Sequence, residues 1–210
     1  MTPPRGRFIS LEGGEGVGKT TQLAALALAL RDRGIDLVTT REPGGSEGAE
    51  AIRTLLLSGE EGRWSPRAEA LLFAAARADH VEKTILPALE AGKWILADRF
   101  LDSSLAYQGG GAGLGSDPVR ALHAFGSEDF LPDRTLVLLL GEREGISRAD
   151  ERDRGSSDRI GRRGSAFHLD VDRAFRQLGS IEPERVRLVD ASGDRDAVTA
   201  RLLGQLCDLL

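Results

Sequence analysis

A glycine-rich segment near the N-terminus constrains the fold most strongly. Residues 13–20 read Gly-x-x-x-x-Gly-Lys-Thr and lie between a short apolar run and a long amphipathic stretch. Glycines let the backbone curl so that its N–H groups point inward, and the start of a helix adds partial positive charge. Between a strand and a helix, this pattern predicts a loop that binds the phosphates of a nucleoside triphosphate. The predicted phosphate-binding residues are Gly13, Gly14, Glu15, Gly16, Val17, Gly18, Lys19, Thr20 and Thr21.

The rest of the chain alternates between apolar runs and helical patterns. Runs rich in Ile, Val and Leu predict five strands, at about 7–12, 35–40, 93–98, 134–140 and 185–190. Helical patterns separate or follow them at about 19–33, 47–57, 66–91, 101–108, 117–127, 142–152, 166–179 and 195–209, and Pro87 can interrupt the third of these. The alternation predicts a three-layer α/β P-loop fold with a five-stranded parallel sheet. At 210 residues the length also allows two small domains, but no linker separates them and one domain is expected.

Composition narrows the classes of partner and the compartment. A net charge of −5 argues against a nucleic-acid coat or an anionic membrane surface as partner. The longest apolar run, residues 23–30, is too short to span a bilayer, and no signal-peptide core precedes the first strand. The single cysteine, Cys207, excludes an internal disulfide and is expected on a buried helical pattern. These features predict a cytoplasmic protein in a reducing compartment.

Charged and hydroxyl side chains at the ends of predicted strands indicate the chemistry. Lys19 would neutralise the β- and γ-phosphates, and the Thr20 hydroxyl would ligate Mg²⁺. The third predicted strand ends at Asp98, and Arg99 comes next, at the edge where open α/β sheets bind ligands. These residues offer a carboxylate for Mg²⁺ and a guanidinium for phosphate. A surface ion pair at a strand end is the alternative for these two residues. The chain contains no Asn, which disfavours a GTPase that reads guanine through Asn-Lys-x-Asp.

Further motifs point to a second nucleotide site. The stretches are EGGEGVGKTT (12–21), TREPGG (40–45), LLFAAAR (71–77), DRFLDSSLAYQGGG (98–111) and SDRI (157–160). In this order they resemble the thymidylate kinase family. The resemblance implies transfer of a phosphoryl group from ATP to dTMP, giving dTDP, by one domain over residues 1–210 with a lid at about 148–164. A kinase for another nucleoside monophosphate, or a nucleotide-dependent switch, is the alternative.

The resemblance implies roles for residues of the dTMP site. Phe73 would stack on thymine, with Arg77, Ser104 and Gln108 on the base edge. Arg53, Arg77 and Arg99 would meet at the phosphate, and Arg41 is a weaker candidate. Glu15 would face the 3′-hydroxyl, Tyr107 would close the 2′ position and Pro43 would form a wall. By pattern alone Phe73 is a core residue, each arginine is a solvated surface charge and EPGG is a turn.

The same resemblance implies how catalysis would work. Some family members carry a basic residue in the phosphate loop and others, with glycine there, carry the catalytic arginine in the lid. This chain has Gly16 in the loop and several arginines between 148 and 163, so the implied catalytic residues are Lys19, Arg99, Arg148 and Arg159. A charged, solvated loop is the alternative. No general base is required, because a phosphate with a second pKa of about 6 is already anionic near neutral pH.

This chain departs from the family pattern at two positions, which bear on the lid and on the metal contacts. Family members commonly have an acidic residue near Leu139 and a Glu where this chain has Gly161.

The family usually forms homodimers through a helix like that predicted at 66–91. Its apolar face, with Leu71, Leu72, Ala75 and Val81, would equally suit an internal core.

Overall fold

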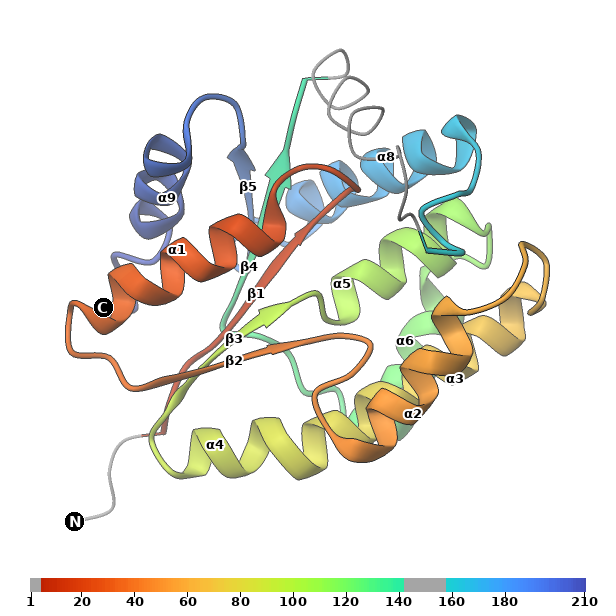
Figure 1. Ribbon diagram of the computed structural model, residues 1–210, viewed down its shortest axis with the longest axis horizontal. Helices are drawn as coiled ribbons and strands as arrows, with labels where there is room; N and C mark the ends of the chain where they lie inside the picture. The colour runs from red at the N-terminus through yellow and green to blue at the C-terminus, as the bar shows by residue number, and fades with distance from the viewer. Residues whose placement is uncertain (1–4, 142–157) are drawn as a thin grey trace.

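Five parallel strands form the centre of the molecule, in the order β2-β3-β1-β4-β5 (Figure 1). The computed structural model describes residues 5–141 and 158–210. The strands are β1 (Phe8–Gly13), β2 (Leu37–Arg41), β3 (Trp94–Asp98), β4 (Arg134–Leu139) and β5 (Val186–Asp190). The predicted α/β fold and its five strands are confirmed. Because all the strands run in one direction, their carboxyl ends share one edge of the sheet.

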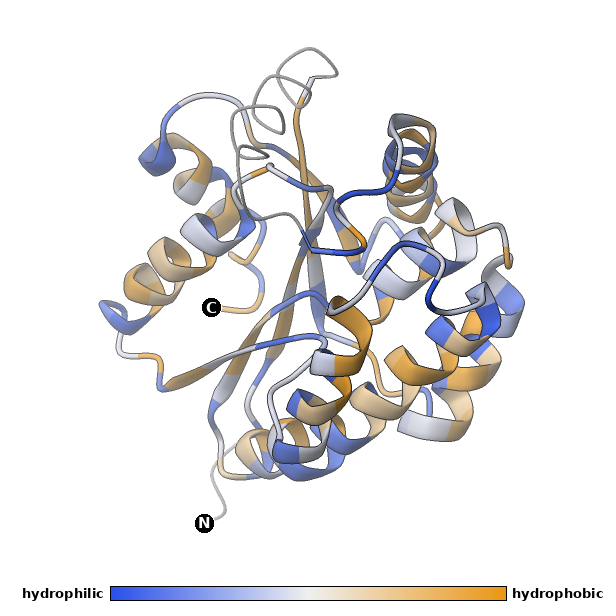
Figure 2. Cartoon of the chain, turned by 45° about the vertical axis from the view of Figure 1, so that its right-hand side comes forward, coloured by the Kyte–Doolittle hydropathy of each residue, from blue (hydrophilic) through white to orange (hydrophobic). Residues whose placement is uncertain are grey.

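Helices cover both faces of this sheet. One face carries α1 (Lys19–Arg31) and α9 (Arg195–Gly204). The other carries α3 (Pro66–His80), α4 (Leu86–Glu90), α5 (Leu101–Ser104), α6 (Ser116–Ser127) and α8 (Ser165–Ile181), and α2 (Glu47–Leu57) packs against α3. Figure 2 shows apolar colouring along the central strands and mixed colouring along the helices. The three layers place two hydrophobic cores on either side of one sheet.

Strand β1 shows how side-chain alternation sorts residues between these two cores. Ile9 and Leu11 pack with α1 and α9, whereas Phe8 packs on the opposite side. Successive side chains of a strand point to opposite faces, so Ser10 and Glu12 share the face of Phe8. Both polar side chains are fully buried. The alternation therefore directs a carboxylate into the layer that contains α5.

The helix predicted over 66–91 is continuous but not uniform. Its middle is the π-helical segment η1 (Val81–Ile85), which joins α3 to α4, and Pro87 lies in the first turn of α4. Proline removes one helical N–H and crowds the preceding turn, and the wider π turn accommodates that change. A second π-helical segment, η2 (Leu105–Gly111), extends α5.

The C-terminal residues differ from the sequence predictions in two ways. Helix α9 stops at Gly204, and Cys207 is exposed rather than buried. Leu206 occupies the buried position in the turn that follows the helix.

The helix predicted at 142–152 lies outside the described residues. None of the helices in the described part of the chain combines the length and apolar character that crossing a membrane requires.

Candidate active site

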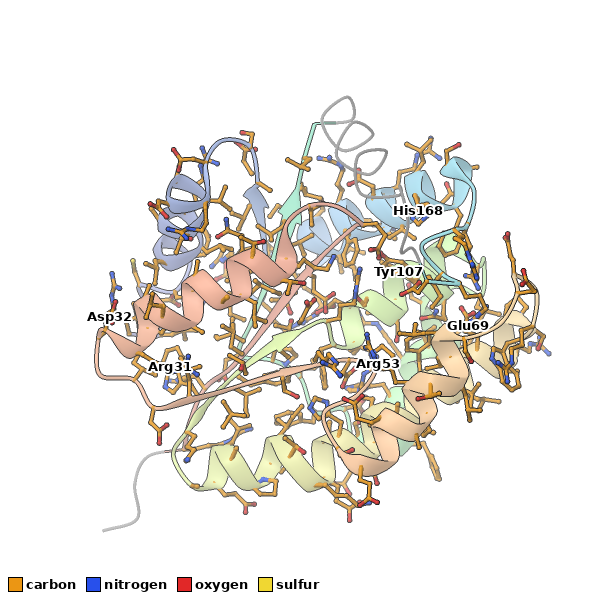
Figure 3. The ribbon with its side chains drawn as sticks, viewed as in Figure 1. Arg31, Asp32, Arg53, Glu69, Tyr107 and His168 are labelled. Atoms are coloured by element: carbon orange, nitrogen blue, oxygen red, sulfur yellow. The ribbon has the colours of Figure 1, made fainter. Side chains whose placement is uncertain are left out.

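A cleft of about 460 Å³ opens at the carboxyl edge of the sheet. It brings together all nine residues predicted for the dTMP site: Glu15, Pro43, Arg53, Phe73, Arg77, Arg99, Ser104, Tyr107 and Gln108. Lys19, Thr20, Thr21 and Asp98 line the same cleft. Figure 3 shows Arg53 and Tyr107 in the part of the molecule between α2 and α8, far from Arg31 and Asp32 at the end of α1. The two predicted sites are therefore parts of one cavity.

The glycine-rich loop forms one end of the cleft. Gly13 has a φ of 135°, and a Cβ there would lie 2.5 Å from the carbonyl oxygen of Leu138. Lys19 begins α1, and its Nζ donates to the carbonyl oxygens of Gly13 (3.1 Å) and Gly14 (2.7 Å). Burial, with the nearby Arg99 charge, lowers the pKa of Lys19 to about 8. The loop thus holds its lysine folded against its own backbone.

Thr20 and Asp98 meet beside the loop, as predicted for a metal site. The Thr20 hydroxyl donates to Asp98 Oδ2 over 3.2 Å. A hydroxyl and a carboxylate are hard oxygen donors of the kind that Mg²⁺ prefers, and Mg²⁺ commonly takes its remaining ligands from water and substrate phosphates. No group of three or more His, Cys, Asp or Glu side chains suited to a metal occurs among residues 5–141 and 158–210. The pair fits a metal that arrives with a nucleotide.

Arg99 occupies the centre of the cleft. It follows β3 with a φ of 73°, a left-handed conformation that is uncommon for a residue with a side chain. Its guanidinium donates to the Gly13 carbonyl oxygen (3.0 Å), Glu15 Oε1 (2.7 Å) and Tyr107 OH (3.1 Å). Burial raises the pKa of Tyr107, so its hydroxyl keeps a proton and donates to Glu15 (3.1 Å).

Glu12 fixes the turn that carries Arg99. Its side-chain oxygens accept from the backbone N–H of Phe100 (2.7 Å) and from Ser103 Oγ (2.5 Å). Ser103 Oγ in turn accepts from Arg99 Nη1 over 2.9 Å. Burial, and next the charge of Asp102, raise the pKa of Glu12 to about 8. Glu12 is not among the residues predicted from the sequence, although an acidic residue at the end of an otherwise apolar strand is a signal that could have identified it.

The opposite end of the cleft carries Phe73 and Arg77, both on α3. Phe73 is half-buried and lines the cleft, although it also packs against the adjacent core. Arg77 is buried, and it donates from Nε to Glu42 Oε2 (2.8 Å) and from Nη2 to Ser104 Oγ (2.7 Å). Arg77 is therefore not a solvated surface charge. Glu42, which also contacts the His80 ring (3.1 Å), is a second residue that sequence reasoning missed.

Two further arginines lie at the rim near β2. Arg53 donates from Nη1 to the carbonyl oxygen of Pro43 over 2.6 Å, which ties the helix α2 to the loop after β2. Arg41 is exposed and pairs with Glu50 at 3.1 Å. Both side chains line the cleft. Burial lowers the pKa of Arg53, with the neighbouring Arg41 charge adding to the effect.

Arg159, which was predicted to be catalytic, is buried outside the lining of the cleft. The side chain is fully buried, donating from Nε to the Leu56 carbonyl oxygen (2.9 Å) and from Nη2 to Glu69 Oε2 (2.6 Å). In this structure the Arg159 guanidinium does not line the cleft, and its contact with the transferring phosphoryl group stays a prediction. Its neighbours Asp158 and Ile160 line the cleft instead. Arg148 lies outside the described residues.

Comparison with known proteins identifies the family. The family model described as thymidylate kinase matches residues 11–202. A thymidylate kinase of Rhizorhabdus wittichii is 60% identical over 98% of this chain and 99% of its own length. The chain belongs to the thymidylate kinase family. It is accordingly an enzyme that phosphorylates dTMP to dTDP with ATP, which sets aside the alternatives of a switch and of a kinase with another acceptor.

Other thymidylate kinases agree over nearly the whole length. Those of Bradyrhizobium sp. and Caulobacter vibrioides are 46% and 45% identical, each over 94% of this chain and over 88% and 94% of their own lengths. The crystal structure of thymidylate kinase from Ehrlichia chaffeensis aligns with a TM-score of 0.78 and 30% identity, covering 97% of this chain and 99% of that one. The fold therefore corresponds to that family from end to end.

Proposed function

We propose that the transfer takes place between two nucleotides held end to end in the cleft. The ATP phosphates occupy the loop at residues 13–20, and dTMP lies between that loop and Phe73. The observation that carries this proposal is the convergence of nine acceptor-site residues with Lys19 and Thr20 in one cavity. Arg99 contacts the loop on one side and Tyr107 on the other, so it lies where the two phosphate groups would meet.

The reaction then depends on alignment and on neutralising charge. Lys19 binds the β- and γ-phosphates, while Arg99 and Arg53 hold the acceptor phosphate in line with the γ-phosphorus. The acceptor oxygen attacks the γ-phosphorus and the bond to the β,γ-bridging oxygen breaks, which leaves ADP and dTDP. Thr20 and Asp98 would hold Mg²⁺, which supplies positive charge to the donor phosphates when bound.

The remaining contacts select the acceptor. Phe73 stacks on the base, and Arg77, Ser104 and Gln108 meet its edge. Glu15 and Tyr107 face the sugar, where the Tyr107 ring would exclude a 2′-hydroxyl. Because Arg77 is anchored to Glu42 deep in the cleft, we assign it to the base rather than to the phosphate. Pro43 forms a wall of the pocket.

The lid assignment stays a proposal for residues 148–164. Arg159 serves as an anchor at the end of that segment, since its partners are Leu56 and Glu69. Arg148 remains the candidate for the catalytic arginine of the lid. An Arg148→Ala variant should lose kcat with little change in the KM for dTMP. An unchanged kcat would assign the role to another arginine.

A panel of acceptors tests the proposal directly. ADP formation is measured with dTMP, dUMP, CMP, UMP, AMP and GMP, with ATP held in excess. We expect the highest kcat/KM with dTMP, and loss of activity on removing Mg²⁺ with a chelator that is restored by adding Mg²⁺ back. Equal use of CMP or AMP would contradict the assignment of the base-contacting residues. Soaking crystals with dTMP would then locate the base relative to Phe73.

We also propose a homodimer formed through α3 and α6. These helices pack together, with Gly126 of α6 near Ala78 of α3, and they expose Leu71 (56%) and Phe125 (93%). Val81, by contrast, is buried in the chain's own core, so only part of the predicted apolar face is available to a partner. Leu71→Glu with Phe125→Glu should convert a dimer to a monomer in sedimentation. A monomeric wild type would contradict the proposal.

A further inference from the structure

Three segments far apart in the sequence meet at the buried carboxylate of Glu69 on α3. Its Oε2 accepts from Arg159 Nη2 (2.6 Å) and from Arg163 Nη2 (2.6 Å). Its Oε1 accepts from Gln108 Nε2 over 3.0 Å. Glu69 and Arg159 are both fully buried, and Figure 3 shows Glu69 in the same region as Arg53 and Tyr107. One oxygen is thus used by charged partners and the other by a neutral amide.

This arrangement determines which way the Gln108 amide faces. A carboxylate that receives two guanidinium groups acts only as an acceptor, so Gln108 must turn its NH₂ group toward Glu69. The Gln108 carbonyl oxygen then points the other way. Gln108 lines the cleft. Its Oε1 accepts no hydrogen bond from the described residues, and this oxygen is not fully buried. The base end of the cleft therefore presents an oriented acceptor.

We infer that Glu69 is a positioning residue that makes the cleft select pyrimidines carrying a hydrogen on N3. The inference rests on the proposed contact between Gln108 and the base edge. Thymine has an N3–H, whereas cytosine has a lone pair at N3. A fixed Gln108 carbonyl oxygen accepts a hydrogen bond from the N3–H of thymine. Opposite cytosine the same oxygen faces the N3 lone pair, and two buried acceptors that face each other without a hydrogen cost binding free energy.

The neighbouring groups fit the same selection. Ser104 lies one helical turn before Gln108, and its hydroxyl contacts Arg77 Nη2 at 2.7 Å. A guanidinium and a hydroxyl beside the acceptor can donate to a carbonyl such as O4 of thymine, whereas the amino group of cytosine is itself a donor. Arg159 and Arg163 act through Glu69, because their guanidinium groups donate to Oε2 and leave Oε1 for the Gln108 amide. Neither contacts Gln108 in this arrangement.

Exchanging the carboxylate for an amide tests this role. In Glu69→Gln the new side chain can donate as well as accept, so the Gln108 amide is free to reverse. We expect the ratio of kcat/KM for dTMP over dCMP to fall at least tenfold, with a lower inhibition constant for dCMP against dTMP. Glu69→Asp keeps an acceptor-only carboxylate and should retain most of the preference.

A double-mutant cycle with Gln108→Leu separates positioning from a general structural effect. Gln108→Leu alone should lower the dTMP preference, and adding Glu69→Gln should then lower it no further. If Gln108→Leu leaves the preference unchanged, the proposed base contact itself fails. If Gln108→Leu lowers the preference and Glu69→Gln does not, the base contact stands and the role of Glu69 is overturned.

Matched variants guard against misfolding. Glu69→Gln leaves two arginines without their charge partner, so Glu69→Gln with Arg163→Gln restores the net charge and is the variant to use if the single one does not fold. Asp102→Asn removes another fully buried carboxylate, one that pairs with Arg185 at 2.7 Å. It should lower stability without changing the dTMP to dCMP ratio. An equal fall in that ratio would show that any buried carboxylate produces the effect.

Discussion

The two ends of the cleft are built in different ways. At the phosphate end, eight consecutive residues supply the glycine loop, Lys19 and Thr20, and the lysine is held by carbonyls of the same loop. At the base end, Arg77 is held by Glu42, 35 residues away, and Glu69 is held by Arg159, 90 residues away. The phosphate loop is thus held mainly by its own backbone, with Asp98 and Arg99 as its distant partners, whereas the base end is held by ion pairs between remote residues. Variants can test each half of this contrast.

The largest effect is expected at the phosphate end. Lys19→Met removes the charge that neutralises the donor phosphates without disturbing distant partners. We expect kcat to fall roughly 10³-fold, the upper range for losing one transition-state donor, while thermal stability changes little. Steady-state kinetics and a thermal melt measure the two quantities. Lys93→Met is the control and should behave as wild type, since Lys93 is a half-exposed lysine that precedes β3 and lies outside the cleft.

The next effect concerns the stability of the base end. Glu42→Gln leaves the buried Arg77 without its charge partner, and the Arg77 and Glu42 side chains are only 3% and 4% exposed. Breaking a buried pair in this way costs about 3 kcal/mol of unfolding free energy. Urea unfolding measures the loss, and the KM for dTMP should rise with it. A variant as stable as wild type would show that the base end does not depend on this remote pair.

Removing the stacking ring should have a smaller effect that is specific to one substrate. Phe73→Ala loses base stacking of about 1–3 kcal/mol, or roughly a 5- to 150-fold rise in Kd for dTMP. The Kd for ATP should stay constant because the phosphate end is built separately. Calorimetric titration of each nucleotide gives both numbers, and Phe73→Tyr should bind as wild type. A matching loss of ATP affinity would argue against two independent ends.

An effect of a different kind is a pH dependence of stability that involves Glu12, which lies between the two ends. Its folded pKa of about 8 is above the ordinary value near 4.5, so the folded protein holds this proton more tightly than the unfolded chain. The resulting stability is fully present below pH 4.5 and is lost as the pH rises toward 8, with a slope of at most one proton. Glu12→Gln should remove that slope. Parallel urea-unfolding profiles for both proteins between pH 5 and 8 would contradict the shift.

The same contrast explains what could be predicted from the sequence. The five strands and the phosphate loop were predictable because their signals are contiguous: apolar runs, glycines at fixed spacing and a lysine at a helix start. The membership of Phe73 in the cleft followed only from family resemblance, since by pattern alone it is a core residue. The structure shows it to be partly both, because it lines the cleft and packs against the core.

Arg159 shows why the remainder was not predictable. Its surroundings in the sequence are charged and rich in glycine, which is typical of a solvated loop. Its burial depends on the carboxylate of Glu69 and the carbonyl of Leu56, and neither is near it in the chain. The structural roles of Glu12, Glu42 and Glu69 were missed for the same reason. Each side chain holds a guanidinium or an N–H group that only the tertiary fold brings next to it.

The exposed position of Cys207 has a practical consequence. It is the chain's one thiol, it follows α9 on the face opposite α3 and α5, and none of residues 205–210 lines the cleft. A maleimide fluorophore therefore attaches at a single place on the unaltered sequence and leaves the cleft's lining intact. Anisotropy of the labelled enzyme can report subunit association at nanomolar concentrations, where sedimentation lacks sensitivity.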